Sequence, residues 1–364
     1  MVRSAVCGLH RNRFRLPVSK GVFLNGAGRR LELPLKPFDL QSQPTHAGHR
    51  RVQLSKGPDG LRYAHRSARE TSPCVEGWIV GKGAMLIVDA YAHIYSNDRK
   101  RYPPKEEPGE PEEPAAAEDL RRRMDEAGVT RAVFVQPMSF YGWDIRYVMD
   151  ATRENREWAT GVIPVNPDES AHLELLQDAV QTYGIRGIRP VADPTSRFST
   201  PNVYRLCRKA RDLGVVVNTA LDDNLDRVQD IAKIASDLDD LRIVLHHCLM
   251  LNARQNTEAT LSALKLLSER PNVYAKLTPG AMGSSEAYPH GDMHEPLKRV
   301  IEYFGPERCA WGACFPNARW TKGTSYRQNL KLFTEELGLS QAEQEAILGT
   351  TALRLWFPDA ASSG

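Results

Sequence analysis

Short apolar runs recur between residues 85 and 314, and each is followed by a polar loop and a helical pattern. The first lies in Met85–Tyr95, MLIVDAYAHIY, where Leu86, Ile87 and Val88 stand between glycines and a polar segment. A run rich in β-branched residues and bounded by turn formers predicts a buried β-strand. Seven further runs predict strands over residues 131–136, 161–165, 184–190, 214–220, 241–247, 272–277 and 309–314.

Helical patterns separate these runs. The first, Glu118–Ala127, is followed by Gly128, a residue that accepts the left-handed conformation of a helix C-cap. The others cover residues 145–155, 170–183, a segment beginning near 200–202, 225–238, 257–269, 294–304 and 326–337. Alternating strands and helices imply a parallel sheet covered by helices, and eight such units close a barrel. We therefore predict an α/β fold, a TIM-like (β/α)8 barrel.

A doubly wound open sheet is the alternative fold. It is not favoured, because no glycine-rich phosphate loop follows any predicted strand. The same observation leads us to expect no nucleotide cofactor.

Three segments lie outside the repeating pattern. Residues 1–84 are rich in Arg, Gly, Pro and Ser and carry 15 Lys and Arg against 5 Asp and Glu, so we expect a basic, mostly disordered leader. Residues 85–358 form the predicted barrel, and residues 359–364 a tail. The acidic, proline-rich segment 97–118 is too long for a simple connector, and such loops are usually lids, binding loops or disordered segments.

Composition narrows the function classes. The chain has 364 residues, of which 41% are hydrophobic, enough for one large barrel. Residues 85–364 carry 33 Lys and Arg against 40 Asp and Glu, so we expect no nucleic-acid binding. No apolar run approaches the ~20 residues that cross a bilayer, so we expect no membrane partner. Six scattered cysteines indicate reduced thiols and a cytoplasmic location, while the Arg-rich start keeps organellar import as the alternative.

Polar side chains stand where the predicted strands end, which is where barrels of this type build their sites. Because side chains alternate along a strand, Asp89, Tyr91 and His93 are expected to share one face. Further residues at strand ends are Gln136, Arg189, Asn218, His246, His247, Lys276 and Cys314. One polar residue at such a place is commonly structural, and Asp89 and His93 could simply satisfy each other. The coincidence of many indicates a site.

Several motifs resemble the amidohydrolase-related family, of the type described as amidohydrolase 2. The segments that carry the resemblance are DAYAH after the first strand, GIRGIRP, IVLHHC, PNVYAKLT, ERCAWGACFP and AILGTTALRLWF. The likeness covers about residues 85–358. It implies a TIM-barrel, metal-dependent hydrolase, in a family that includes lactonases and some decarboxylases.

The chain departs from the family pattern at the positions where the family binds metal. Four residues differ: Tyr91 and Asn218 stand for histidines, and His246 and Cys314 stand for aspartates. The residues His93, His247 and Cys314 could still hold zinc, since histidine and thiolate are good zinc ligands. We take these three residues as the candidate metal ligands. We expect Asp89 to contact the site residues without binding the metal itself.

The catalytic candidates are His93, His246, His247 and Cys314. Loss of the family's aspartate leaves no general base unless His246 or another group substitutes, and such a loss typically lowers rates by about 10²- to 10⁴-fold. Cys314 has a second interpretation as a nucleophile whose pKa a histidine lowers.

The candidate substrate-binding residues are Tyr91, Arg189, Asn218 and Lys276. A cationic pair near a barrel mouth suits an anionic substrate such as a carboxylate. The resemblance implies that the arginine ending the fourth strand binds that group in the lactonase branch. The alternative is that Lys276 points outward and Arg189 pairs with a structural carboxylate.

The leading interpretation is a hydrolase that acts on a lactone or amide bond of a small carboxylate-bearing molecule, with a degenerate divalent-metal site for which zinc is the expected ion. One alternative is a catalytically silent barrel that retains a ligand pocket. Another is a decarboxylase of the same superfamily, although its acidic signature on the first strand is not evident. The expected partner is a small, anionic substrate.

Overall fold

The computed structural model describes residues 23–24, 30–31, 85–191, 198–219 and 227–361. Contacts divide the chain between Cys74 and Val75. In the first unit, the described residues are β1 (Phe23–Leu24) and β2 (Arg30–Leu31), which pair antiparallel. The remaining leader residues, for which we predict disorder, lie outside the described residues.

The second unit contains eight parallel strands whose order in the sheet follows the chain. The strands are β3 (Val88–Ala92), β4 (Arg131–Val135), β5 (Ala159–Val165), β6 (Ile185–Pro190), β7 (Val216–Asn218), β8 (Ile243–Leu245), β9 (Val273–Leu277) and β10 (Cys309–Trp311). The last strand returns to the first, because Ala92 and Phe315 form a parallel bridge and the His93 amide donates to the Phe315 carbonyl at 2.8 Å. The predicted TIM-like barrel is confirmed.

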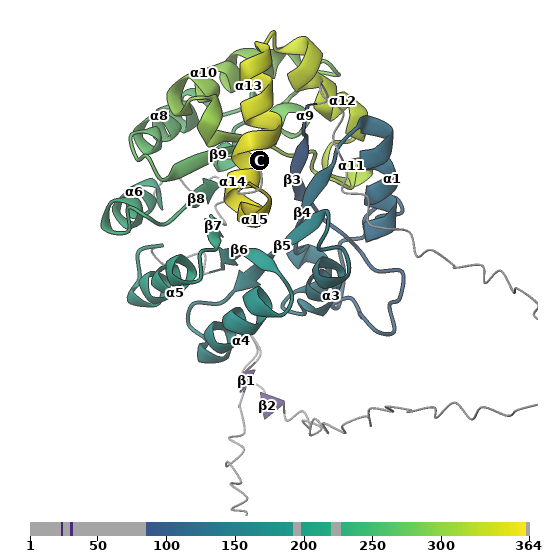
Figure 1. Ribbon diagram of the computed structural model, residues 1–364, viewed down its shortest axis with the longest axis vertical. Helices are drawn as coiled ribbons and strands as arrows, with labels where there is room; N and C mark the ends of the chain where they lie inside the picture. Colours follow the sequence, from purple (N-terminus) through teal and green to yellow (C-terminus); the bar gives the residue numbers. More distant parts are fainter. Residues whose placement is uncertain (1–22, 25–29, 32–84, 192–197, 220–226, 362–364) are drawn as a thin grey trace, which may run out of the picture. The chain divides into compact units, whose positions relative to one another are not determined.

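Helices surround this ring of strands (Figure 1). Those that follow the strands or their loops are α1 (Ala117–Ala127), α2 (Met138–Tyr141), α3 (Arg146–Glu154), α4 (Ser170–Gln181), α5 (Pro201–Asp212), α6 (Val228–Asp237), α7 (His247–Met250), α8 (Thr257–Ser268), α9 (Pro279–Gly283) and α10 (His294–Phe304). The C-terminal region adds α11 (Asn317–Trp320), α12 (Tyr326–Lys331), α13 (Gln341–Glu345), α14 (Thr351–Trp356) and α15 (Pro358–Ala361), with π-helical turns at Leu332–Glu336 and Ala346–Thr350.

Local sequence explains where these helices begin and end. Gly128 closes α1 at φ 74°, as predicted, because a residue without Cβ adopts this conformation at little cost. At α5, the Thr200 side chain accepts a hydrogen bond from the Val203 amide, and Pro201 occupies the first turn.

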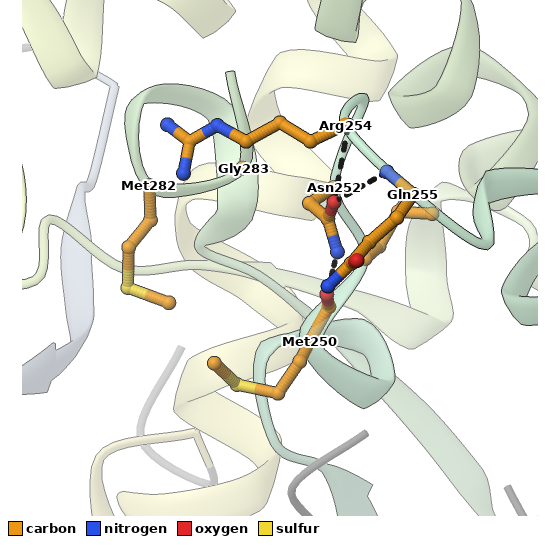
Figure 2. A pocket seen from close by; sticks show the side chains of 7 residues that line it. Met250, Asn252, Arg254, Gln255, Met282 and Gly283 are labelled. Atoms are coloured by element: carbon orange, nitrogen blue, oxygen red, sulfur yellow. Dashed lines mark hydrogen bonds between the residues drawn. The ribbon is translucent and has the colours of Figure 1, made fainter. Parts of the chain in front are cut away.

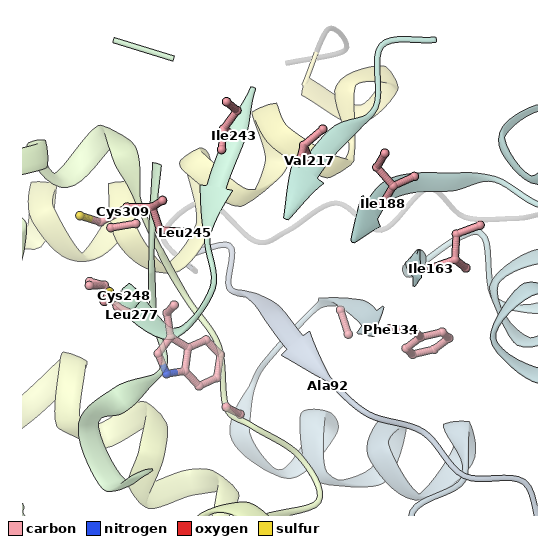
Figure 3. Close-up of a cluster of buried hydrophobic side chains, with 14 of the residues drawn as sticks. Ala92, Phe134, Ile163, Ile188, Val217, Ile243, Leu245, Cys248, Leu277 and Cys309 are labelled. Atoms are coloured by element: carbon pink, nitrogen blue, oxygen red, sulfur yellow. The ribbon is translucent and has the colours of Figure 1, made fainter. Parts of the chain in front are cut away.

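The hydrophobic core has two layers. The outer layer lies between strands and helices, and Figure 3 shows side chains that the strands contribute to it, from Phe134 on β4 to Leu277 on β9. The inner layer fills the barrel with small and branched residues such as Val133 and Val244, together with Tyr91. This packing is that of a filled core, so chemistry is confined to the rim.

The C-terminal segment closes the barrel at the end where the strands begin. Leu355, Trp356 and Phe357 join the inner layer. The Arg131 guanidinium, on the first residue of β4, lies 5.2 Å from the Phe357 ring centre. The opposite end, where the strands finish, is therefore the mouth.

The predicted loop 97–118 gives way to helix at Ala117. Backbone hydrogen bonds hold it: the amides of Lys105 and Gly109 donate to Phe140 and Ser139, each at 2.8 Å. Within the described part of the chain, no helix is long and apolar enough to span a bilayer.

Candidate active site

The hydroxyl group of Tyr91 lies at the centre of the barrel mouth. Its oxygen is 3.0 Å from His93 Nε2, 3.4 Å from His246 Nε2 and 3.4 Å from Arg189 Nη2. These partners come from β3, β6 and the end of β8. The structure therefore brings together four of the residues predicted from strand ends, with a phenol at their centre.

The hydrogen-bond partners of His93 fix the direction of this network. Its Nδ1 lies 2.6 Å from the Val135 carbonyl oxygen, which only accepts, so Nδ1 carries the proton. Nε2 is then an acceptor, and the Tyr91 hydroxyl donates to it. Burial lowers the pKa of His93 to about 3, so the ring is neutral near pH 7.

His246 and His247 stand side by side, with ring centres 3.8 Å apart. Burial and then neighbouring positive charges lower the pKa of both well below the usual value, so both are neutral at physiological pH. His247 Nδ1 contacts Thr278 Oγ1. His246 Nδ1 is buried without a hydrogen-bond partner among the described residues, which leaves one imidazole nitrogen able to accept a proton.

The backbone after β8 is unusual. His247, Cys248, Leu249 and Met250 have φ values of 46°, 48°, 56° and 57°, so α7 is a single left-handed turn. Residues with a Cβ lose roughly 1–2 kcal/mol each in this conformation. Strain of this kind is commonly found where a side chain must be aimed, and here it sets the direction of His247.

Arg189 is partly buried and donates from Nη2 to Tyr91. Among the described residues it forms no ion pair with a carboxylate, and its Nε is buried without a partner. The alternative that Arg189 serves a structural carboxylate therefore has no support in this part of the chain. Its charge is available for an anion.

Lys276 lies inside the barrel, below the mouth. Its Nζ donates to Asn218 Oδ1 at 3.1 Å and lies 4.9 Å and 5.0 Å from the ring centres of Tyr91 and Trp356. The side chain is 0% exposed, and burial lowers its pKa to about 7. The expectation that Lys276 might point outward is wrong. Lys276 and Asn218 therefore lie in the interior of the barrel, where Lys276 contacts both Asn218 and the Tyr91 ring.

Asp89 has a structural set of contacts. Its Oδ1 accepts from the amides of Tyr91 (3.0 Å) and Ala313 (2.9 Å), and its Oδ2 accepts from the Tyr326 hydroxyl (3.0 Å). Burial raises its pKa to about 6. The carboxylate joins β3 to the segment after β10 and holds Tyr91 in place.

Cys314 is 1% exposed, with φ 55°, and its Sγ lies 3.9 Å from the Thr278 carbonyl oxygen. Burial raises the pKa of this thiol far above its usual value. Nucleophilic attack needs the thiolate, so we do not assign Cys314 the role of nucleophile.

The donors at the mouth do not fit a divalent metal ion as they stand. The Nε2 lone pair of His93 accepts the hydrogen bond of the Tyr91 hydroxyl. The charges of Arg189 and Lys276 oppose a cation. Within the described residues, no three His, Cys, Asp or Glu side chains form a group that could hold a metal, and the candidate set His93, His247 and Cys314 is thus not such a group.

Three contacting residues were missed by sequence analysis. Thr278 meets His247 and Cys314, Trp320 stacks near His93 with ring centres 5.5 Å apart, and Tyr326 holds Asp89. Thr278 could have been found, because it stands directly after β9, at a strand end like the other candidates. Trp320 and Tyr326 lie in helices, and no signal near them points to the mouth. Gln136, a strand-end candidate, instead donates to the Asp144 carbonyl at 2.8 Å.

The family model described as amidohydrolase matches residues 88–357. No sequence among the curated proteins matches the chain significantly.

Among solved structures, the chain is similar to a protein from Pseudomonas putida assigned as a 2-pyrone-4,6-dicarboxylic acid hydrolase. The identity is 22%, the TM-score is 0.62, and the match covers 75% of this chain and 98% of that one. An amidohydrolase from Burkholderia multivorans with bound zinc is 18% identical, with a TM-score of 0.60 and coverage of 75% and 99%. A 2,6-dihydroxybenzoate decarboxylase from Rhizobium is 12% identical, with a TM-score of 0.52 and coverage of 76% and 100%. At these identities the likeness establishes the fold alone.

Proposed function

This chain belongs to the amidohydrolase family, and from that membership we propose that it is a hydrolase that opens a lactone or amide bond in a small carboxylate-bearing molecule. The observation that carries the proposal is the guanidinium of Arg189, which has no carboxylate partner among the described residues and lies beside Tyr91 and two neutral histidines. The similarity to the P. putida protein assigned as a lactone-opening hydrolase supports this reaction class.

Arg189 binds the substrate carboxylate. A guanidinium offers two parallel donors that match a carboxylate, and partial burial strengthens the interaction. This contact orients the scissile carbonyl over the mouth.

Tyr91 donates its hydroxyl proton to the carbonyl oxygen. Burial raises the pKa of Tyr91, so the phenol stays protonated at neutral pH. Its donation then moves from His93 Nε2 to the oxygen on which negative charge develops. A donor aimed at such an oxygen contributes about 10²- to 10³-fold to the rate.

His246 acts as general base. Its Nδ1 is buried and without a partner among the described residues, so this step requires that a water molecule reach it when substrate binds. Nδ1 then accepts a proton from that water as the water oxygen bonds to the carbonyl carbon. The carbon–oxygen bond of the lactone ring then breaks, and the same proton passes to the leaving alkoxide. The product is a hydroxy acid, and His246 returns to its neutral form. No step uses a metal ion.

The test is hydrolysis by full-length protein treated with a chelator. We expect turnover above the buffer rate for a lactone that carries a carboxylate, unchanged by chelation, and a loss of about 10²- to 10⁴-fold in His246→Gln. His294→Gln, outside the mouth, is the matched control. Absence of turnover on a lactone and amide panel would overturn the proposal.

A silent barrel that only binds an anion is the second candidate. It is favoured by the hydrogen bonds of the Tyr91 hydroxyl to His93 and to His246, and by the burial of these three residues, which are 4%, 4% and 9% exposed. Restoring the family residues through Tyr91→His with Cys314→Asp discriminates. Hydrolysis that appears only in the double variant supports the silent barrel, and an active wild type contradicts it. In both cases we propose a small anionic ligand and a cytoplasmic location.

A further inference from the structure

A cavity of about 490 Å³ lies beside the mouth. Its lining includes Arg254, Met282, Tyr288, Arg319 and Trp320. A second cavity, also of about 490 Å³, shares Arg254 and Met282 with the first. Figure 2 shows the Arg254 side chain extending from its loop toward Met282. The two hollows therefore meet around one guanidinium.

Two cations in the first cavity lack acidic partners. Arg254 donates to the Ser284 carbonyl at 2.5 Å, and Arg319 donates to the Glu110 carbonyl at 2.5 Å. Neither forms an ion pair with a carboxylate among the described residues, and Arg319 Nε is buried without a partner. Among the described residues, no carboxylate therefore compensates the charge of either guanidinium.

The other charged groups of the lining have partners. Lys322 pairs with Glu112 at 3.0 Å. The acidic residue of the lining is Glu286, whose carboxylate accepts from the Asp292 amide at 3.2 Å and keeps its negative charge, one against the two guanidinium charges. The available charge of the cavity is thus positive.

The cavity and the mouth share a wall. The Trp320 ring lies 5.5 Å from the His93 ring, and on the cavity side the Arg319 guanidinium lies 4.8 Å from Trp320. Met282 and Trp320 both pack against the inner cluster that contains Tyr91. One side-chain layer separates the proposed reaction centre from the cationic cavity.

We propose that this cavity is a second anion site, which binds a carboxylate or phosphate group at the far end of an elongated substrate. The hydrolysed bond lies at Tyr91, the near carboxylate at Arg189, and the far anion at Arg254 and Arg319. The substrate class is then a molecule with two anionic groups, one on each side of Trp320. Only the assignment to a substrate rests on the proposed function; anion binding itself does not.

Inorganic phosphate is the probe, measured by calorimetric titration of full-length protein. The titration uses Arg189→Gln as background, so that the mouth does not contribute a second site. We expect Arg254→Gln and Arg319→Gln to weaken phosphate binding by about 10- to 100-fold, the usual cost of a lost charged hydrogen bond. Lys322→Gln, in the same cavity but already paired with Glu112, is the matched control and should change binding less than about threefold.

Absence of phosphate binding in the millimolar range, or binding that Arg254→Gln leaves unchanged, overturns the proposal. A substrate tail is distinguished from free phosphate by kinetics. Arg254→Gln should lower kcat/KM for a lactone with a distal phosphate or carboxylate by about 10-fold or more and leave the tail-free lactone unchanged. Equal loss on both substrates contradicts a tail site. Phosphate binding without lactone turnover would refute the proposed function and keep the anion site.

Discussion

At the scale of single residues, Tyr91 determines what the mouth can do. Its hydroxyl donates a hydrogen bond to His93 Nε2, the nitrogen whose lone pair would have to bind a metal. The same hydroxyl is held by Arg189 and faces His246. The Tyr91 phenol thus stands at the centre of a network formed with His93, His246 and Arg189.

Tyr91→Phe tests this network. We expect the rate of lactone hydrolysis to fall by about 10²- to 10³-fold, because the donor to the carbonyl oxygen is lost. We expect unfolding free energy to fall by about 1–3 kcal/mol, because His93 Nε2 loses its partner. Steady-state kinetics and urea denaturation measure both. Tyr183→Phe is the control, because Tyr183 precedes β6 at the end where strands begin and its ring lies against Arg153, away from the mouth. A Tyr91→Phe enzyme of wild-type rate would contradict the role of the phenol.

Lys276 predicts a dependence of stability on pH. Its pKa is about 7 in the folded protein, against an ordinary value of 10.5, so between these values the unfolded chain binds one more proton. Stability therefore rises with pH from about 7 to 9, by up to about 1.4 kcal/mol per pH unit. Urea denaturation across this range should show the slope in wild type and lose it in Lys276→Met. Exposed Lys298→Met should keep it, and a slope that survives in Lys276→Met would refute the assignment.

Most of these residues are predictable from the sequence, because apolar runs show where strands end. The sequence does not show which of these side chains are protonated or how deeply each is buried in the barrel. Lys276 and Arg189 look alike in the sequence, yet one is fully buried below Tyr91 and the other partly exposed beside it. The depth follows from the stagger of the strands and from Trp356, which arrives from the far end of the chain.

At the scale of elements, the left-handed turn α7 is the unexpected feature. The apolar run 241–247 predicted a strand through His247, but β8 ends at Leu245. Residues 247–250 instead wind left-handed without a single glycine. Local propensity disfavours this path, so the tertiary contacts of His247 and Leu249, both buried, must enforce it.

A comparison of Met250→Gly with Met250→Ala isolates the strain of this turn. Met250 has φ 57° and is only partly buried, so glycine relieves the conformational cost without a large loss of packing. We expect the glycine variant to be more stable than the alanine variant by about 1 kcal/mol. At Ser262, exposed in the right-handed helix α8, the order should reverse by a similar amount. Calorimetric melting measures the difference, and the same order at both positions would refute strain at α7.

Gly312 links β10 to the position of Tyr91. A Cβ there would lie 2.7 Å from Tyr91 Cβ and 3.0 Å from the Tyr91 backbone nitrogen. Gly312→Ala should therefore displace Tyr91 and lower both kcat and the melting temperature. The control is Gly291→Ala, whose Cβ meets only the flexible Glu286 carboxylate at 3.1 Å. If Gly312→Ala kept full activity, close packing against Tyr91 would not matter.

At the scale of the whole molecule, one end of the barrel is closed by packing and the other carries the candidate site. Trp356 and its neighbours fill the end where strands begin, and Asp89 fastens the first strand to the segment after the last. The regular alternation of apolar runs and helices made this architecture predictable from the sequence. Closure itself was not predictable at residue level, because it depends on long-range pairs such as Asp89 with Tyr326.

The cationic side chains proposed to bind an anionic substrate lie at the opposite end of the barrel, where the strands finish. Arg189 lies at the mouth, and Arg254 and Arg319 line the neighbouring cavity. A barrel body that is mildly acidic overall thus places unpaired guanidinium groups around one opening. Selectivity for anions is therefore a property of this end of the fold rather than of net charge.

The most direct measurement is the ratio of kcat/KM for a carboxylated lactone to that for its neutral methyl ester, in chelator-treated wild type and in Arg189→Gln. We predict that wild type hydrolyses the free acid without added metal and prefers it by about 10- to 100-fold, because a charged hydrogen bond contributes about 1.5–3 kcal/mol. We expect Arg189→Gln to remove this preference. Activity that disappears on chelation and returns with zinc, or a preference that survives in Arg189→Gln, would contradict these predictions.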